Sequence, residues 1–125
     1  MKQNIDINQL KELNTNQLKK LHDVFHNPFL FRIAYQKDFD LKVDQSDYSE
    51  ASAAIKIGIM IEILINNHEK YKDDILLDIY QSTIAEEENK LCYIYKDFRA
   101  IEDGNHDYIN RNLCDGLWEA IVSMI

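Results

Sequence analysis

The stretch ASAAIKIGIMIEILI, Ala51 to Ile65, is the long apolar run around which the rest of this chain is organised. Of its fifteen residues only Ser52, Lys56 and Glu62 are polar. On a helical wheel these three fall within about a third of the circle, which leaves the remaining surface apolar. A helix of this kind must be covered by other elements, so the stretch predicts a central core helix over residues 51–66.

The apolar positions of this helix are expected to be largely buried: Ile55, Ile57, Ile59, Ile61 and Leu64. Successive odd-numbered isoleucines point in different directions on a helix, so their burial requires neighbours on several sides. A transmembrane helix needs about 18–20 apolar residues, more than this stretch contains. The stretch also carries a lysine and a glutamate, and we expect no membrane insertion.

The composition indicates a globular, helical protein. An apolar content of 46% with 29% charged residues argues against a disordered chain. Three glycines and one proline in 125 residues leave few turn signals, which favours helices over a many-stranded sandwich or barrel. We predict an all-α fold, a compact bundle of about five to seven helices around the helix at 51–66, in a single domain over residues 1–125.

The start of the chain and the cysteines indicate where the protein acts. Met1 to Leu10 is polar and contains no apolar core of a signal peptide. Cys92 and Cys114 match neither a zinc-binding spacing nor a disulfide framework. We therefore predict two reduced thiols and a cytoplasmic location.

Capping signals place the helices of the first half. Asp6 or Asn8 can cap a first helix, and the run Asn14-Thr15-Asn16 interrupts it and can restart it with a new cap. Asn27-Pro28, an N-cap followed by proline at the first helical position, predicts a helix from Pro28 to about Lys37. The residues that this helix is expected to bury are Phe29, Leu30, Ile33 and Ala34.

Two features lie between this helix and the central stretch. Residues 39–44 alternate apolar and polar side chains, so a short strand and an extended connector fit equally well. Asp47 is the expected cap of the helix that enters the central stretch.

Helices are also predicted after the central stretch. Asp73 or Asp74 can cap a segment from Ile75 to about Gln81, and a further helix is expected from Ile84 to Glu102. A strand at Leu91 to Tyr95 competes with the second of these helices, because aromatic and β-branched residues there have high β-propensity.

The last predicted helix follows the turn Asp103-Gly104-Asn105 and is capped by Asp107. Its apolar residues recur at helical spacing and should share one face: Ile109, Leu113, Leu117, Ile121 and Met124. No repeat or linker interrupts the chain before it.

The net charge of −8 is unevenly distributed. Residues 1–42 carry seven Lys or Arg and five Asp or Glu, whereas residues 43–125 carry seven and seventeen. Between Asp73 and Asp107 there are ten acids and three bases. Such a field repels nucleic acids and membranes and attracts basic partners. We therefore expect a basic protein partner, and neither nucleic acid nor membrane binding.

Tyrosines accompany these acids. Five of the seven tyrosines lie between residues 71 and 108. Acids can steer the encounter with a basic protein, and tyrosine rings supply rigid contact area at little entropic cost. The predicted partner-binding residues are Asp73, Asp74, Asp78, Tyr80, Glu86, Glu87, Glu88, Tyr93, Tyr95, Asp97, Glu102 and Asp103.

Catalytic and metal-binding motifs are scarce. His22 and His26 have the i, i+4 spacing of a shared metal site, but no HExxH pattern joins them and no third ligand can be identified. No phosphate-binding glycine loop and no Ser/His/Asp or Cys/His nucleophile pattern occurs. We predict that the protein is not an enzyme and needs no metal or cofactor.

Arg99 and His106 are separated by six residues, a spacing that resembles the Arg-x(4–6)-His signature of the HEPN ribonucleases. The resemblance would imply a small helical nuclease in which this pair handles the phosphodiester. The polar residue usual after the arginine is replaced by Ala100, and Gly104 lies where that family keeps a helix. The surrounding acids would also repel an RNA phosphate, so both residues are predicted to be structural or surface residues without a catalytic role.

Size, acidity, helicity and the lack of catalytic motifs together resemble a bacterial immunity protein of the contact-dependent growth inhibition or colicin type. The resemblance implies a one-to-one complex with a basic toxin domain, expected to be a nuclease, whose active site or substrate path the acidic face covers. A phage-encoded anti-defence protein that mimics nucleic-acid charge is the alternative of the same binding class, and the small HEPN-like nuclease is the alternative among enzymes.

Overall fold

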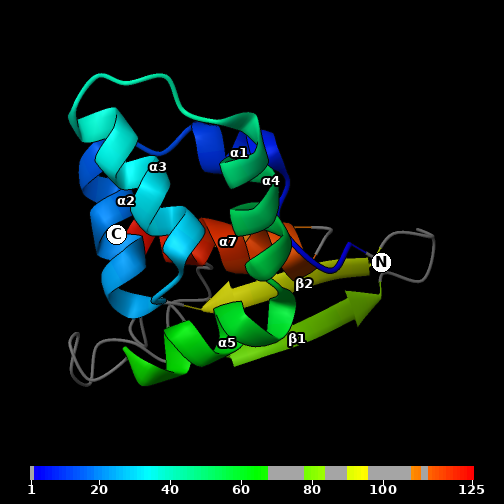
Figure 1. The fold of residues 1–125 in the computed structure, drawn as a ribbon. Coiled ribbons are helices and arrows are strands. Elements are labelled where there is room, and N and C mark those ends of the chain that lie inside the picture. The colour runs from blue at the N-terminus through cyan, green and yellow to red at the C-terminus, as the bar shows by residue number, and fades with distance from the viewer. Residues whose placement is uncertain (1, 68–77, 84–89, 96–107, 111–112) are drawn as a thin grey trace. The chain divides into compact units, whose positions relative to one another are not determined.

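The computed structural model describes residues 2–67, 78–83, 90–95, 108–110 and 113–125 (Figure 1). The chain divides into two compact units. The N-terminal unit comprises Gln3–Lys56 together with Ile125, and the C-terminal unit comprises Met1–Lys2 and Ile57–Met124. The single domain expected over residues 1–125 stays a prediction.

Four helices make the N-terminal unit: α1 (Ile7–Lys11), α2 (Thr15–Val24), α3 (Pro28–Asp38) and α4 (Gln45–Ala54). Helix α3 packs on both α2 and α4, and α1 packs on α4 (Figure 1). Their apolar faces supply fully buried side chains, including Leu10, Leu18, Leu21, Leu30 and Ile33. Hydrophobic burial of this kind is the main favourable term that holds short helices together.

The helix starts follow from local capping. Asp6 caps α1 and Asn14 caps α2, each in a reciprocal capping box with the glutamine three residues later. The side chain of Asn14 accepts from the amide of Gln17 at 2.8 Å, and the Gln17 side chain accepts from the amide of Asn14 at 3.0 Å. The predicted interruption at Asn14 is therefore confirmed, because these side chains satisfy amides that a new helix leaves without a partner.

Asn27 is the expected cap of α3, and the predicted bounds of this helix are confirmed to within one residue. Its side-chain oxygen accepts from the amides of Phe29 at 2.9 Å and Leu30 at 3.2 Å. Of the residues predicted to be buried, Leu30, Ile33 and Ala34 are buried and Phe29 is half-buried.

Replacing Asn27 by Ala should lower the free energy of unfolding by about 1 kcal/mol, because two amide donors of α3 lose their acceptor. Chemical denaturation followed by circular dichroism measures the change. Asn27→Asp keeps a capping oxygen and is the matched control, expected to lie close to the unsubstituted protein. Equal losses in both variants would show that the cap does not stabilise α3.

The predicted central helix over 51–66 is wrong in one respect: it is two helices, α4 and α5 (Ile57–Asn66). Ile55 has φ −88° and ψ 79°, which is not helical. Its carbonyl oxygen accepts instead from the amide of Ile5 at 3.2 Å, beside an antiparallel bridge between Asn4 and Lys56. This pairing with the start of the chain explains the break, since a helical Ile55 could not offer its carbonyl in this way.

The break also changes which side chains are buried. Ile55 is fully buried as expected, whereas four predicted core residues are only half-buried: Ile57, Ile59, Ile61 and Leu64. In α5 the buried residues are Met60 and Ile63. The buried pair is spaced by three, as one narrow face of a helix requires, so α5 is covered on one side and is not surrounded.

The segment after α3 is a connector, and the structure shows no strand in residues 39–44. Asp40 has φ +54° and closes α3 in the place that glycine usually takes. The amide of Leu41 donates to the carbonyl of Gln36 at 2.8 Å and that of Asp40 to Lys37 at 3.2 Å, the two bonds of a Schellman motif. This turn occupies the start of residues 39–44, so their alternating apolar and polar side chains do not form a strand.

The predicted cap at Asp47 is wrong, because Asp44 begins α4 three residues earlier. The Asp44 carboxylate accepts from the amide of Ser46 at 3.0 Å and from its hydroxyl at 2.9 Å. These bonds stabilise the charged form and hold the pKa of Asp44 below its usual value. Asp47 is buried instead, with Oδ1 3.6 Å from Nη1 of Arg32 on α3.

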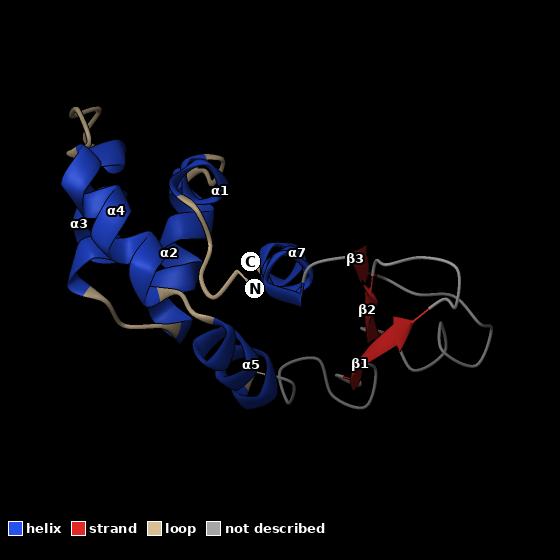
Figure 2. Cartoon of the chain, turned by 90° about the vertical axis from the view of Figure 1, so that its right-hand side faces the viewer, coloured by secondary structure: helices blue, strands red, loops and turns tan. Residues whose placement is uncertain are grey.

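The C-terminal unit combines helices with a small antiparallel sheet. The strands are β1 (Asp78–Thr83), β2 (Lys90–Tyr95) and β3 (Tyr108–Asn110), in the spatial order β1-β2-β3. Helix α7 (Leu113–Met124) packs on β2, β3 and α5. Figure 2 shows α5 and α7 on the same side of the sheet.

The prediction of a mostly helical chain is confirmed, with six helices in the described part. The three strands of the C-terminal unit correct this prediction for the residues that form them. Residues 78–81, 90–95 and 108–110 were assigned to helices, and the strand considered at Leu91–Tyr95 is the alternative that holds. The reason is tertiary: β2 has partner strands on both sides, whose backbones supply the ladder hydrogen bonds that a lone strand lacks.

Helix α7 carries the last apolar face. Leu117 and Ile121 are fully buried, while Leu113 and Met124 are half-buried. Ile109 is not part of this helix, because it lies in β3. Cys114 is fully buried, and Asp115 pairs with Lys2 at 2.7 Å. None of the helices in the described ranges is long and apolar enough to cross a membrane.

Candidate protein-binding surfaces

Four of the twelve predicted partner-binding residues lie in the sheet of the C-terminal unit. The register of β1 and β2 places Asp78 opposite Tyr95 and Tyr80 opposite Tyr93. Residues two apart share one face of a strand, and directly opposed residues share one face of a pair. The fold therefore brings these four positions together on one face of the β1–β2 pair.

The other eight predicted residues lie outside the described part of the chain: Asp73, Asp74, Glu86, Glu87, Glu88, Asp97, Glu102 and Asp103. Arg99 and His106, the pair that resembles the HEPN signature, also lie outside it. For these residues we use only their charge and their position along the chain.

The two units differ in net charge. Residues 3–56 carry seven Lys or Arg and eight Asp or Glu, so the N-terminal unit is almost neutral. The remainder of the chain carries seven Lys or Arg and fourteen Asp or Glu. Nearly all of the acidic excess therefore belongs to the C-terminal unit, which also holds the cross-strand tyrosines.

A second surface, which the sequence analysis missed, is a row of exposed rings on α3. Phe31, Tyr35 and Phe39 are 56%, 51% and 60% exposed, and successive ring centroids are 6.4 and 4.7 Å apart. The His22 ring on α2 extends the row, 5.6 Å from Phe31. We call Phe31 and Tyr35 of α3, together with its C-cap residue Phe39, the aromatic stripe. The i, i+4 spacing of these three aromatic residues is the sequence signal for this surface.

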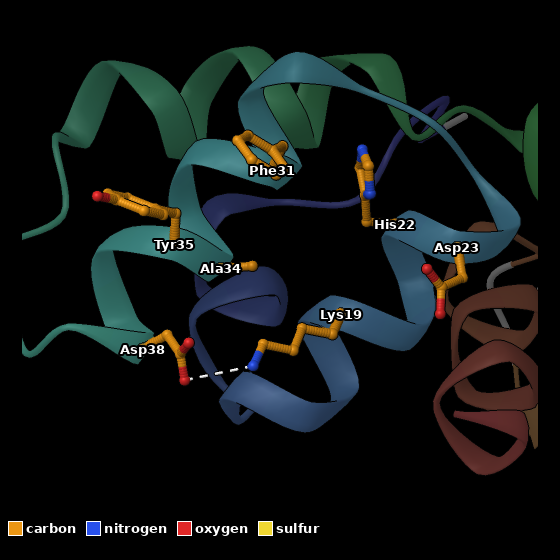
Figure 3. Close-up of a pocket in the computed structure, with 7 residues that line it drawn as sticks. All are labelled: Lys19, His22, Asp23, Phe31, Ala34, Tyr35 and Asp38. Carbon is orange, nitrogen blue, oxygen red and sulfur yellow. Dashed lines mark ion pairs between the residues drawn. The ribbon is translucent and has the colours of Figure 1, made fainter.

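A hollow of about 420 Å³ lies beside the aromatic stripe, between α2 and α3 (Figure 3). Figure 3 shows Phe31 and His22 at its upper side and the small side chain of Ala34 between the two helices. Nζ of Lys19 and Oδ1 of Asp38 pair across its lower side at 3.3 Å. The residues that line it are Lys19, His22, Asp23, Phe31, Ala34, Tyr35 and Asp38.

The two histidines considered for a metal site do not lie on one helix. His22 is in the last turn of α2, whereas His26 follows the helix end, and their rings meet edge to face at 5.2 Å. Across the residues that the structure describes, no group of three or more His, Cys, Asp or Glu could hold a metal ion. The contact is an aromatic one that extends the row of rings beyond Phe31.

Neither a protein-family model, nor a curated protein, nor a solved structure matches this chain.

Proposed function

We propose that this protein is an immunity-type inhibitor that binds a basic toxin domain, most simply a nuclease, through the acidic, tyrosine-bearing C-terminal unit. The observation that carries the proposal is the coincidence of charge with structure. The acidic excess belongs to the unit whose β1–β2 pair places Asp78, Tyr80, Tyr93 and Tyr95 on one face.

Each part of this arrangement has a task in such a complex. An excess of acids accelerates the encounter with a basic surface, and this effect weakens with salt. Tyrosines on paired strands are held at fixed spacing by the backbone, with opposed Cβ atoms roughly 5 Å apart. A tyrosine also has only two side-chain torsions to fix, so its ring can act as an anchor that slows dissociation at little entropic cost.

Inhibition in this way requires no chemistry from the inhibitor. A nuclease carries basic groups that bind the phosphates of its substrate. An acidic surface is attracted to the same groups, and once bound it excludes the substrate from them. The proposal therefore assigns binding roles to its residues and no catalytic role or cofactor.

The experiment begins with capture of the partner from a lysate of the host, followed by identification of the captured protein by mass spectrometry. The purified partner is then tested for nuclease activity with and without a stoichiometric amount of this protein. The proposal expects one basic partner whose activity is lost in the complex. Capture of an acidic partner, or a complex that leaves the activity intact, would contradict it.

Reversing Glu86, Glu87 and Glu88 to Lys alters the charge by two at each site, +6 in total. We expect the association rate at low salt to fall by about tenfold or more, because long-range attraction is lost. Stopped-flow or surface-binding kinetics at about 0.05 M and 0.5 M salt measure this rate, and the difference between variants should shrink at high salt.

The control reverses Glu12 and Glu50, both exposed in the almost neutral N-terminal unit. It alters the charge by the same amount per site, and we expect the association rate to change less than about threefold. If control and triple reversal slowed association equally per charge, net charge alone would act and the C-terminal unit would not be the binding site.

A further inference from the structure

Strand β1 forms one edge of the three-stranded sheet. Within the described ranges it pairs with β2 alone, and Figure 2 shows the strands in the order β1-β2-β3. In an antiparallel pair, alternate residues turn their N–H and C=O groups away from the partner strand. Half of the six residues of β1 therefore present a donor and an acceptor at the outer edge, enough for about six further hydrogen bonds.

The edge of β1 lacks the features that usually keep a further strand from pairing. Natural edges are protected by short length, proline, lysine or a bulge. β1 has six residues, contains no proline or lysine, and pairs with β2 at six successive positions without a bulge. The opposite edge is formed by β3, which has only three residues. Of these two edges, β1 is the one suited to accept another strand.

The charge around β1 selects the strand that it can accept. Residues 73–89 contain six Asp or Glu and no Lys or Arg, and β1 lies in the middle of them. One residue spans at most about 3.6 Å of chain, so the backbone of each of these acids lies within about 20 Å of β1. Charges act over about this distance at low salt, and the field of these acids attracts a basic segment.

Other occupants fit this edge less well. A second copy of β1 would bring the same six acids against the first set, so like charges would oppose the pairing. An acidic segment of another protein would meet the same repulsion. An extended segment with lysine or arginine at alternate positions gains both the backbone hydrogen bonds and the attraction.

We infer that the outer edge of β1 is a strand-addition site, at which an extended basic segment of the partner becomes a further strand of the sheet. Backbone hydrogen bonds supply the attachment, and the lysine or arginine side chains of the added strand supply the selectivity. The inference rests on the proposed function for the nature of the partner. It adds how the partner is held, through the backbone of β1 as well as through the tyrosine-bearing face.

The first test is amide hydrogen exchange in the free, full-length protein, followed residue by residue by NMR. Exchange should alternate along β1, slow where an amide bonds to β2 and at least about tenfold faster at the residues between. Uniform exchange at all six residues, whether slow or fast, would overturn the inference, because the outer edge would then be covered or the strand not held in the sheet.

The probe for the basic segment is an octapeptide of alternating lysine and valine, blocked at both ends. At low salt it should bind with a dissociation constant below about 1 mM and slow the exchange of the fast amides of β1. One control peptide carries N-methyl groups on two successive central residues, which removes a donor from each of its edges. A second control replaces each lysine by glutamate. Both should bind at least about tenfold more weakly.

No binding of the lysine peptide at about 1 mM would overturn the inference. Equally tight binding of the N-methylated peptide would overturn it because no strand would be added, and equally tight binding of the glutamate peptide because charge would not select the segment.

A charge placed on β1 locates the bound peptide. Ser82→Lys lies on the face of β1 that Tyr80 shares. It should raise the dissociation constant of the lysine peptide by about threefold or more and lower that of the glutamate peptide. Ser49→Lys adds the same charge at an exposed position of α4 and should leave both constants within about twofold. Equal effects of the two variants would overturn the inference. Circular dichroism verifies folding, and Thr83→Lys, at the end of β1, replaces Ser82→Lys if that variant does not fold.

The complex with the captured partner separates this inference from the proposed function. The fast amides of β1 should become protected in that complex. A basic partner that is inhibited while these amides still exchange fast would overturn the inference and leave the proposed function standing. A β1 edge that passes the peptide tests in a protein that inhibits no partner would support the inference and refute the proposed function.

Discussion

Replacing Ile33 by Ala should lower the free energy of unfolding by about 2–5 kcal/mol. Ile33 is fully buried on the face of α3 that packs into the N-terminal unit. Removing its outer carbons loses their transfer free energy and leaves a cavity that rigid neighbours fill only in part. Urea denaturation followed by circular dichroism measures the loss.

The matched control is Phe31→Ala, two residues earlier on the same helix and 56% exposed. It removes a larger side chain, yet the loss should stay near or below about 0.5 kcal/mol, since exposed positions contribute little to folding. Both variants are measured at the same low protein concentration. If both variants lost the same free energy of unfolding, Ile33 would not be more buried than Phe31 in the folded protein, and the assignment of the buried face of α3 would be wrong.

Replacing Tyr93 by Ala should raise the dissociation rate of the complex with the basic partner by about thirtyfold, equivalent to about 2 kcal/mol. Tyr93 is central in the β1–β2 pair, opposite Tyr80 and two residues from Tyr95. Loss of a central anchor acts on dissociation because short-range contacts form after the encounter. The association rate should therefore change little, in contrast to the reversal of the three glutamates.

Two variants separate a binding role of Tyr93 from a structural one. Tyr93→Phe keeps the ring and should recover most of the slow dissociation. Tyr108→Ala removes a tyrosine that pairs with Ile94, a position that alternates with Tyr93 and so belongs to the other face of the sheet. If Tyr108→Ala accelerated dissociation as much as Tyr93→Ala while unfolding was unchanged, the binding face would be assigned wrongly.

The features that sequence alone determined are those settled within a few residues. The cap at Asn27 was predicted, and Asp6 and Asn14 were among the candidate caps, because the acceptor and the amides that it satisfies lie within three positions of each other. The buried side of α3 followed from helical periodicity in the same way. The charge asymmetry was also evident, since it requires only counting.

Other features were decided by partners far away along the chain. The apolar stretch 51–65 breaks at Ile55 because that carbonyl bonds to Ile5, fifty positions earlier, which periodicity cannot reveal. Lys90–Tyr95 is a strand because β1 and β3 pair with it, whereas its local pattern favoured a helix over the competing strand. The exposure of Phe31, Tyr35 and Phe39 depends on which side of α3 its neighbours cover. Local propensity differs between such alternatives by only about 1 kcal/mol per residue, so contacts distant in sequence decide between them.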